Sequence, residues 1–352
     1  MAPLPLTVGE IDAAWITTAL RSRYPDAQVE RLEQVQIIEG TATKVLVDLT
    51  FARDGQPEGV PARLWVKGGF AEHREYVGAL GVYAGEVRFF RDIAPLYDLH
   101  RPRSWFALAQ DDPIQGIVGL EDLNARGAAF ARATRPLTLE EARAGLDTLA
   151  ALHAQSWGDG RPAELGVEPV MGATTEQIWL DWFAALPVLF SMPRSFASPV
   201  LLHDPDRLQK AATAYRTAAQ STLACLVHGD SHIGNCYIEP DGSVGFVDWQ
   251  TVARGSWEHD VTYFLVSALD LPDRRAHERE LLDHYLASLA AHDIPTTKGG
   301  EAWDIYRRAT VYGFLCWLCN PDIWQPAEVN TATFARFALA MLDHDTYALL
   351  GV

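Results

Sequence analysis

The chain has 352 residues, of which 48% are hydrophobic and 21% are charged. This balance is typical of an ordinary folded protein and excludes a disordered chain, a collagen-like repeat or, with four cysteines, a disulfide-built scaffold. The formal net charge of −17, without any basic cluster, argues against binding to nucleic acid or to an anionic membrane surface.

The first residues lack a cationic segment followed by an apolar one, so we expect no secretory signal. No apolar stretch reaches the roughly 18 residues that a membrane-spanning helix needs. We therefore predict a cytoplasmic protein, and nothing in the composition implies an obligate protein partner.

The first part of the chain is rich in predicted strands. Thr7 to Glu10 forms a capping box, and the apolar spacing that follows predicts a first helix of about fifteen residues. A second helix is predicted around Val87, Phe90 and Ile93. Alternating and β-branched runs predict strands at 29–38, 43–52, 63–67, 104–109 and 117–123.

From residue 124 onward helical periodicity dominates. A capping box at Thr138 to Glu141 opens a helix that reaches His153, which we interpret as a core or helix-terminal histidine. Further helices are predicted at 174–186, 205–220, 274–292, 301–319 and 331–348, and a hairpin at 236–249. The predicted fold class is α+β, with a strand-rich lobe at 1–123 and a helical lobe at 124–352.

The most informative segment is His228-Gly-Asp-Ser-His-Ile-Gly-Asn235, with Asp248 just beyond the hairpin. Phosphoryl transfer needs a carboxylate that orients the attacking hydroxyl, and hard oxygen ligands that hold Mg²⁺ on the phosphates. Asp230, on a tight glycine loop, can be that carboxylate. Asn235 and Asp248 can hold the metal, because the hairpin returns the chain beside Asn235.

This pattern continues with Val247-Asp-Trp-Gln250 and Asp260-Val-Thr-Tyr-Phe264. It resembles the aminoglycoside phosphotransferase and choline kinase group, and within that group the ecdysteroid-kinase-like branch. The resemblance implies a bilobal protein-kinase-like fold with a small antiparallel sheet. It also implies that Asp230 is catalytic, that Asn235 and Asp248 bind magnesium, and that Asp260 is a buried organiser of the catalytic loop.

The strand-rich lobe supplies candidates for nucleotide binding. Lys67 ends a strand, as a phosphate-binding lysine would, and Glu86 on the next helix is its expected partner, ahead of Glu72 and Glu75. The turn at 40–43 would cover the phosphates, although its single glycine departs from the G-x-G-x-x-G of protein kinases. The full set of nucleotide-binding candidates is Lys67, Glu86, Gly40, Thr41, Thr43, Glu121 and Leu123, of which the last two lie where the family contacts adenine.

Two patterns have metal-like spacing. His228 and His232 flank Asp230 as in some metal hydrolases, but that function leaves Lys67 and Asp248 without a role. We therefore interpret both histidines, with Asp260, as structural supports of the catalytic loop. Cys316-Trp-Leu-Cys319 lies in a helix-periodic apolar segment and is interpreted as two buried core thiols.

The sequence thus predicts a kinase that uses Mg²⁺ and ATP and phosphorylates a hydroxyl of a small molecule. Aromatic residues concentrate in the helical lobe and favour a lipophilic alcohol as the acceptor, whereas the acidic net charge would favour an aminoglycoside or a choline-like amine. A catalytically inactive nucleotide-binding regulator is the alternative from another class. The predicted acceptor pocket consists of Trp179, Trp182, Phe183 and Trp317.

Overall fold

The computed structural model describes residues 3–70, 74–111, 114–297 and 299–352. The chain divides into two compact units, residues 1–128 with 248–251 and residues 129–247 with 252–352. These units are defined by compactness, and the functional lobes at 1–123 and 124–352 stay a prediction. Within the described ranges, no helix is both long enough and apolar enough to cross a membrane.

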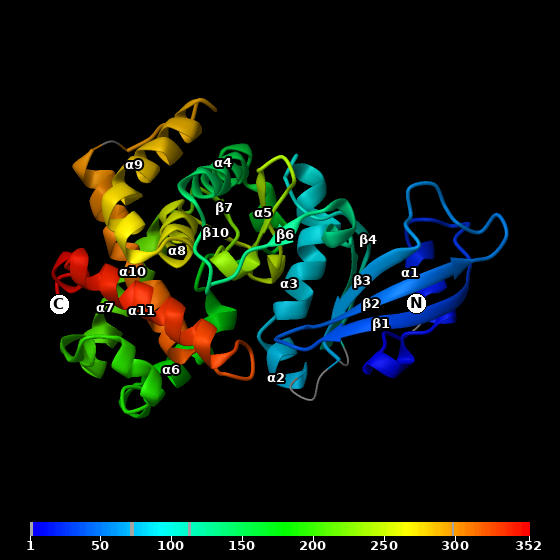
Figure 1. The fold of residues 1–352 in the computed structure, drawn as a ribbon, viewed down its shortest axis with the longest axis horizontal. Helices are drawn as coiled ribbons and strands as arrows, with labels where there is room; N and C mark the ends of the chain where they lie inside the picture. Colours follow the sequence, from blue (N-terminus) through cyan, green and yellow to red (C-terminus); the bar gives the residue numbers. More distant parts are fainter. Residues whose placement is uncertain (1–2, 71–73, 112–113, 298) are drawn as a thin grey trace. The chain divides into compact units, whose positions relative to one another are not determined.

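The first unit is built on an antiparallel sheet of five strands (Figure 1). The order β1-β2-β3-β5-β4 places β3 in the middle, between β2 and β5. Val45 and Val47 of β2 point to the core with Ile16 of the first helix, because alternate residues of a strand share a face. The strands are β1 (Val29–Ile38), β2 (Thr43–Phe51), β3 (Arg63–Gly68), β4 (Ser104–Asp111) and β5 (Ile114–Leu120).

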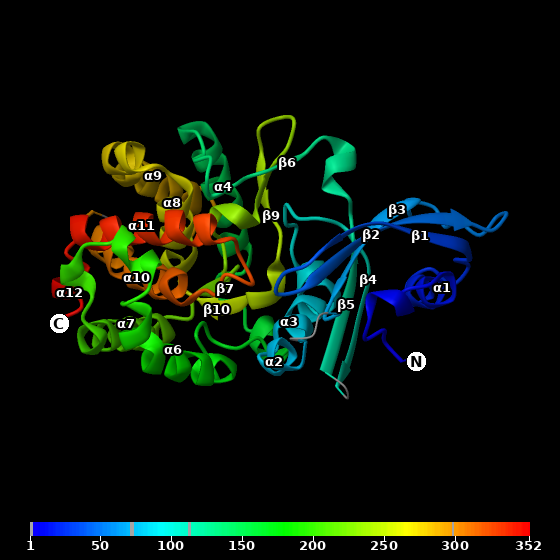
Figure 2. The same cartoon turned by 60° about the horizontal axis from the view of Figure 1, so that its bottom comes forward.

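The first helix differs from its prediction. The capping box at Thr7 begins only a short 3₁₀ helix, η1 (Val8–Glu10). This helix ends at Ile11, which adopts an extended backbone. Asp12 starts the α-helix α1 (Ala13–Arg21) anew, with its carboxylate accepting from the Trp15 N–H at 2.7 Å. Figure 2 shows α1 beside the sheet. The sequence predicted one helix in place of η1 and α1, because the apolar residues of both segments fit a single helical period.

Two helices follow β3, α2 (Arg74–Ala79) and α3 (Val82–Arg88), and α3 runs on into η2 (Phe89–Ile93) and η3 (Ala94–Leu96). Val87, Phe90 and Ile93 are buried, as their spacing predicted. The segment η9 (Trp249–Thr251) packs on α3 within the same unit. The connector beyond β5 contains η4 (Leu123–Arg126).

The second unit is mainly helical (Figure 1). Its helices are α4 (Leu139–Gln155), α5 (Arg161–Glu164), α6 (Glu176–Leu189), α7 (Pro205–Ser221), α8 (Glu258–Ala268), α9 (Leu271–Ala290), α10 (Gly300–Cys319), α11 (Ala327–Asp343) and α12 (Thr346–Leu349), with η5 (Ala173–Thr175), η6 (Pro193–Ala197), η7 (Val200–Leu202) and η8 (Ile233–Asn235). Its strands are β6 (Ala129–Phe130), β7 (Cys225–Val227), β8 (Cys236–Ile238), β9 (Val244–Phe246) and β10 (Ala253–Gly255). The hairpin predicted at 236–249 is the β8–β9 pair.

Two helix predictions need correction. The single helix predicted at 331–348 is two helices, because Asp345 adopts a left-handed backbone (φ 48°) between α11 and α12. The helix α8 was missing from the helices predicted by periodicity. All eleven of its residues are buried, so it has no polar face and therefore no amphipathic period to detect.

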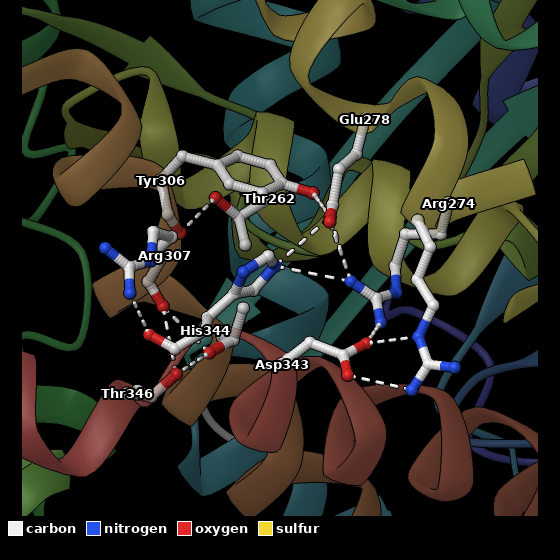
Figure 3. A network of polar contacts seen from close by, with 10 residues as sticks. Thr262, Arg274, Glu278, Tyr306, Arg307, Asp343, His344 and Thr346 are labelled. Carbon is white, nitrogen blue, oxygen red and sulfur yellow. Dashed lines mark hydrogen bonds and ion pairs between the residues drawn. The ribbon is translucent and has the colours of Figure 1, made fainter. Parts of the chain in front are cut away.

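A buried polar network joins α9, α10 and α11 (Figure 3). The Arg274 guanidinium donates to the Glu278 carboxylate at 2.9 Å and also pairs with Asp343. The same Glu278 carboxylate accepts from the Tyr306 hydroxyl at 3.2 Å and lies 3.1 Å from His344 Nε2. Each charged member therefore has an opposite charge or a hydrogen-bond partner, which offsets part of the cost of burying it.

Candidate active site

In the first unit, a buried lysine lies between two carboxylates. Lys67 is 3% exposed, and its Nζ lies 2.7 Å from Glu86 Oε2 and 2.7 Å from Asp248 Oδ1. Strand β3 supplies the lysine and helix α3 supplies the glutamate, which forms the pair expected from the sequence. Burial alone would lower the pKa of Lys67, but Asp248 and Glu86 outweigh it and raise that pKa, so the ammonium stays charged.

The other candidates for the lysine's partner do not reach it. The Glu75 side chain is 91% exposed and lies near Arg74 instead. Glu72 lies outside the described residues. Glu86 is therefore the glutamate that the structure brings to Lys67.

Asp248 is held in an uncommon backbone conformation. Its φ of 68° lies in the left-handed region, which aspartate tolerates better than most residues. The next residue, Trp249, stacks on Phe89 with ring centroids 4.2 Å apart and an interplanar angle of 1°. Gly85 makes room for this segment, because a Cβ at position 85 would overlap the carbonyl oxygen of Gln250. Glycine and aromatic packing thus fix the backbone that presents Asp248 to Lys67.

Sequence reasoning missed a second lysine at this place. Lys44 of β2 pairs in register with Lys67 of β3, so the two side chains share a face of the sheet. Burial lowers the pKa of Lys44, Asp248 and Glu86 act in the opposite direction, and Lys67 adds to the lowering. The alternation of Val45 and Val47 on the other face was the available signal, because it puts Lys44 on the face opposite the apolar core.

The predicted phosphate-covering turn lies between β1 and β2. The Tyr83 hydroxyl of α3 donates to the Thr41 carbonyl at 3.0 Å and so ties the turn to the helix. Gly40 has no positive φ, and an added Cβ there would meet nothing closer than 3.6 Å, so its backbone does not require glycine. Thr43 is 2% exposed, and its hydroxyl has no hydrogen-bond partner among the described residues.

The connector residues Glu121 and Leu123 follow β5. The Glu121 N–H donates to the Arg103 carbonyl at 3.0 Å, and the Glu121 carboxylate accepts from Arg126 at 2.9 Å. Leu123 is buried, and its carbonyl accepts from the Ala128 N–H at 3.2 Å. The connector therefore has a defined backbone course.

In the second unit, the loop after β7 brings Asp230 and Asn235 together. The Asn235 amide nitrogen donates to the Asp230 carbonyl at 2.8 Å and to Asp230 Oδ2 at 3.0 Å. Asn235 is 7% exposed, whereas the Asp230 side chain keeps 27% of its surface exposed. A partly exposed carboxylate oriented by a buried amide is suited to meeting a substrate hydroxyl.

His228 supports this loop through both ring nitrogens. Its Nε2 lies 3.0 Å from the Val247 carbonyl, and its Nδ1 accepts from the Asp230 N–H at 3.3 Å. These partners suit the neutral ring with the proton on Nε2. His232 caps η8, with Nδ1 accepting from the Gly234 N–H at 3.0 Å, and its Nε2 lies 3.6 Å from Asp230 Oδ2. Both histidines thus contact the loop as structural supports would.

Asp260, on α8, is fully buried directly beneath the loop. Its carboxylate accepts from the backbone N–H groups of His228 at 2.6 Å and Gly229 at 2.9 Å. The third partner is His153, whose Nε2 lies 3.1 Å away while its Nδ1 contacts the Tyr285 hydroxyl at 2.7 Å. Burial would raise the pKa of Asp260, but the interaction with His153, first of all its hydrogen bond, acts against burial, and the net effect lowers that pKa. His153 is the core histidine expected from the sequence, and its contact with Asp260 was not foreseen.

The four predicted acceptor residues do not form one cluster. Trp179, Trp182 and Phe183 gather on α6, where the Trp179 and Phe183 rings pack edge to face at 5.7 Å. Trp317 of α10 instead packs its ring against His232 at 5.0 Å, beside the loop that carries Asp230. Tyr312 lies between these places, 6.5 Å from Trp179 and 5.3 Å from Tyr263. Their role in acceptor binding stays a prediction.

The cysteine pair on α10 differs from its prediction. Cys316 and Cys319 are free thiols, but they are half-buried rather than fully buried, although Trp317 and Leu318 between them are buried. Within the described ranges, no group of three or more His, Cys, Asp or Glu side chains is arranged to hold a metal ion.

Structures of small-molecule kinases share this fold. The chain is similar to the GDP and kanamycin complex of APH(2")-IIia, with a TM-score of 0.52, 10% identity, and coverage of 89% of this chain and 96% of that one. It is similar to Plasmodium vivax ethanolamine kinase, with a TM-score of 0.53 and 14% identity. This match covers 88% of this chain and 81% of that one. The chain is also similar to spectinomycin phosphotransferase APH(9)-Ia in complex with ADP and spectinomycin. The TM-score is 0.53, the sequence identity is 14%, and the match covers 96% of this chain and 99% of that one. The predicted α+β, protein-kinase-like fold is therefore confirmed.

Residues 203–294 match the model of the ecdysteroid kinase-like family. This segment contains Asp230, Asn235, Asp248 and Asp260, so the match and the shared fold confirm the resemblance drawn from these residues. No curated protein shows a significant sequence match to the chain.

Proposed function

We propose that this protein is a small-molecule kinase that transfers the γ-phosphoryl group of Mg-ATP to a hydroxyl group. The observation that carries the proposal is the buried Lys67 held between Glu86 and Asp248. A buried ammonium whose pKa is raised by two carboxylates is a fixed positive charge, which is suited to nucleotide phosphates. Glu86 would keep this charge in position when Asp248 turns to the metal.

The proposed magnesium ligands fit the metal by their chemistry. Asp248 and Asn235 carry hard oxygen donors, which Mg²⁺ prefers. The Val247 N–H donates to the Asn235 carbonyl at 2.8 Å, and Asp248 is the next residue in the chain. The Asn235 amide nitrogen already faces Asp230, so its side-chain oxygen is directed elsewhere. Bound magnesium would neutralise phosphate charge.

The proposed chemical step uses Asp230 as the group that receives a proton. Its carboxylate accepts the proton of the acceptor hydroxyl while the hydroxyl oxygen forms a bond to the γ-phosphorus. The bond from the γ-phosphorus to the bridging oxygen breaks, and ADP leaves. Lys67 stabilises the phosphate charge during transfer. Gly40, Thr41 and Thr43, in the turn that leads into β2, are the proposed contacts of the nucleotide there.

For the purine we propose the connector, with the Glu121 carbonyl and the Leu123 N–H as its partners. For the acceptor we propose a lipophilic alcohol, because Trp317 packs against His232 and further aromatic rings lead through Tyr312 to Trp179. We propose that the protein acts in the cytoplasm. A cationic acceptor of the aminoglycoside or choline type would use the same catalytic residues, so an acceptor screen decides between them.

The proposal is tested by calorimetric titration of Mg-ATP into the wild-type protein and a Lys67→Met variant. We expect binding to the wild type and at least about tenfold weaker binding to the variant, because the phosphates lose a fixed charge. Asp283→Asn, on the exposed surface of α9, is the control and should bind as the wild type does. Absence of Mg-ATP binding to the wild type would refute the proposal. A second screen with sterols, macrolides and amino sugars then identifies the acceptor class, and stabilisation by amino sugars alone would overturn the lipophilic alcohol.

A further inference from the structure

The second unit has an exposed apolar surface on α6 and on the segment that follows it. Six large side chains form this apolar surface, and each is between 42% and 80% exposed: Leu180, Val188, Met192, Phe196, Val200 and Leu201. A large apolar side chain presents roughly 150–200 Å² when fully exposed, so the six expose on the order of 650 Å². The largest apolar patch of a typical monomer measures about 300–600 Å², so the apolar surface indicates an interaction site.

The segment between α6 and α7 buries polar side chains while it exposes apolar ones. Ser195 is fully buried, and its hydroxyl donates to the Phe190 carbonyl at 2.9 Å. The Phe190 ring also stacks on His203, with centroids 4.9 Å apart, which brings the two ends of the segment together. The Arg194 guanidinium donates to the Trp317 carbonyl at 3.0 Å and so fastens the segment to the end of α10. The outward apolar side chains are therefore held in place by contacts beneath them.

The same stretch of chain presents almost no charge to solvent. Residues 182–203 contain no aspartate or glutamate, whereas the whole chain has 46 in 352 residues. The one lysine or arginine in this stretch is Arg194, which pairs with Asp322 and has a side chain that is only 11% exposed. A second copy of this chain carries the same net charge of −17, so its approach is opposed least where neither copy presents a charge. The charge distribution therefore favours a second copy as the partner.

The exposed residues of α6 form a ridge that suits twofold pairing. Figures 1 and 2 both show α6 at the edge of the second unit, on the side away from α4 and α9. Leu180, Ala184 and Val188 are four residues apart and all exposed, so they share one face of the helix. When two α6 helices pack antiparallel about an axis at Ala184, Leu180 of each copy meets the partner's Val188. Asp181 then lies opposite the partner's Pro187, so no two carboxylates meet.

We propose that the protein forms a twofold-symmetric dimer through this apolar surface. Two antiparallel α6 helices form the centre of the interface, and Phe196, Val200 and Leu201 of each copy extend it. The apolar surface, together with the small exposed residues between its members, approaches the roughly 800 Å² that each partner buries in a stable interface. All six of its residues belong to the second unit, and none is a proposed catalytic or metal-binding residue.

Sedimentation equilibrium of the full chain tests the proposal. We expect the wild type to have the mass of two chains at micromolar concentration. Ala184→Glu should weaken the dimer at least about a hundredfold, because it places two carboxylates opposite each other at the axis. Ala287→Glu is the matched control, since it adds the same charge at an exposed alanine of α9, and it should dimerise as the wild type does. Circular dichroism checks that both variants are folded.

A cysteine at the axis locates the contact. Ala184→Cys should form a disulfide-linked dimer under mild oxidation, because the axis brings the two copies of this position together, whereas Ala287→Cys should not. The proposal is overturned if the wild type is monomeric at about 50 µM, if Ala184→Glu dimerises as well as Ala287→Glu, or if Ala184→Cys crosslinks no faster than Ala287→Cys. A monomer that binds phosphatidylcholine vesicles, in a way that Ala184→Glu blocks, would assign the surface to lipid and equally overturn the dimer. These measurements need neither nucleotide nor acceptor, so they are independent of kinase activity.

Discussion

Replacement of Asp260 by asparagine tests how the loop that carries Asp230 is held. The Asp260 carboxylate has three hydrogen-bond partners, the N–H groups of His228 and Gly229 and the ring of His153. Asparagine has a single acceptor oxygen, and its amide nitrogen faces donors. At least one buried donor therefore loses its partner, and hydrogen bonds to a charged group contribute about 1.5–3 kcal/mol each.

We expect Asp260→Asn to lower the free energy of unfolding by about 2–4 kcal/mol. For a unit of this size that corresponds to a fall in Tm of about 4–16 °C. Amide hydrogen exchange at His228 and Gly229 should accelerate, and kcat should fall about a hundredfold, because the loop that carries Asp230 loses its anchor. The control Asp283→Asn should leave Tm and kcat unchanged.

The pH dependence of this loss has a defined sign. The pKa of Asp260 is lower in the folded protein than in the unfolded chain, so its carboxylate stabilises the fold above the ordinary pKa of aspartate. That contribution disappears as the pH falls through the folded pKa. The difference in stability between wild type and Asp260→Asn should therefore be constant near neutral pH and shrink below about pH 4. An unchanged Tm and exchange rate in Asp260→Asn would refute the reasoning.

Three further predictions concern other parts of the molecule. Gly85→Ala should lower kcat while keeping the overall fold by circular dichroism, because its Cβ displaces the segment at Gln250 next to Asp248; wild-type kinetics would contradict this. Arg274→Met should destabilise the protein by about 3–5 kcal/mol in urea unfolding, because Glu278 stays buried without its guanidinium; the second change Glu278→Leu should recover part of that loss, and no recovery would show that the pair is not the cause. Burial raises the pKa of Glu258, so its carboxylate opposes folding as the pH rises, and Glu258→Gln should gain stability over the wild type at pH 8 relative to pH 4; an equal difference at both pH values would contradict the assigned cause.

The local part of the site could be predicted from the sequence. Asp230 and Asn235 are five positions apart on one loop, so their spacing alone indicates that they meet. Lys67 and Glu86 were found because each lies on an element with its own periodicity, although α2 intervenes between β3 and α3. The strands of the sheet were predicted for the same reason, since each shows its own alternation.

The remaining features depend on contacts between distant residues. His153 contacts Asp260 although the two residues are far apart in the sequence, and no local pattern around either residue predicts that contact. Lys44 lies opposite Lys67 because of the register of β2 and β3, and this register is known only once the two strands are paired. The helix α8 is buried on every side, so its sequence lacks the polar face that marks other helices.

The central claim is that Asp230 directs a phosphoryl group from Mg-ATP to a small hydroxyl compound. The most direct measurement is transfer of radiolabelled γ-phosphate from Mg-ATP to a pool of small-molecule alcohols, with wild type and Asp230→Asn compared after calorimetry has established nucleotide binding. We expect both proteins to bind Mg-ATP, and only the wild type to produce a labelled small molecule at an appreciable rate. Equal transfer by Asp230→Asn would contradict the claim, as would a wild type that binds Mg-ATP and labels no alcohol in the pool.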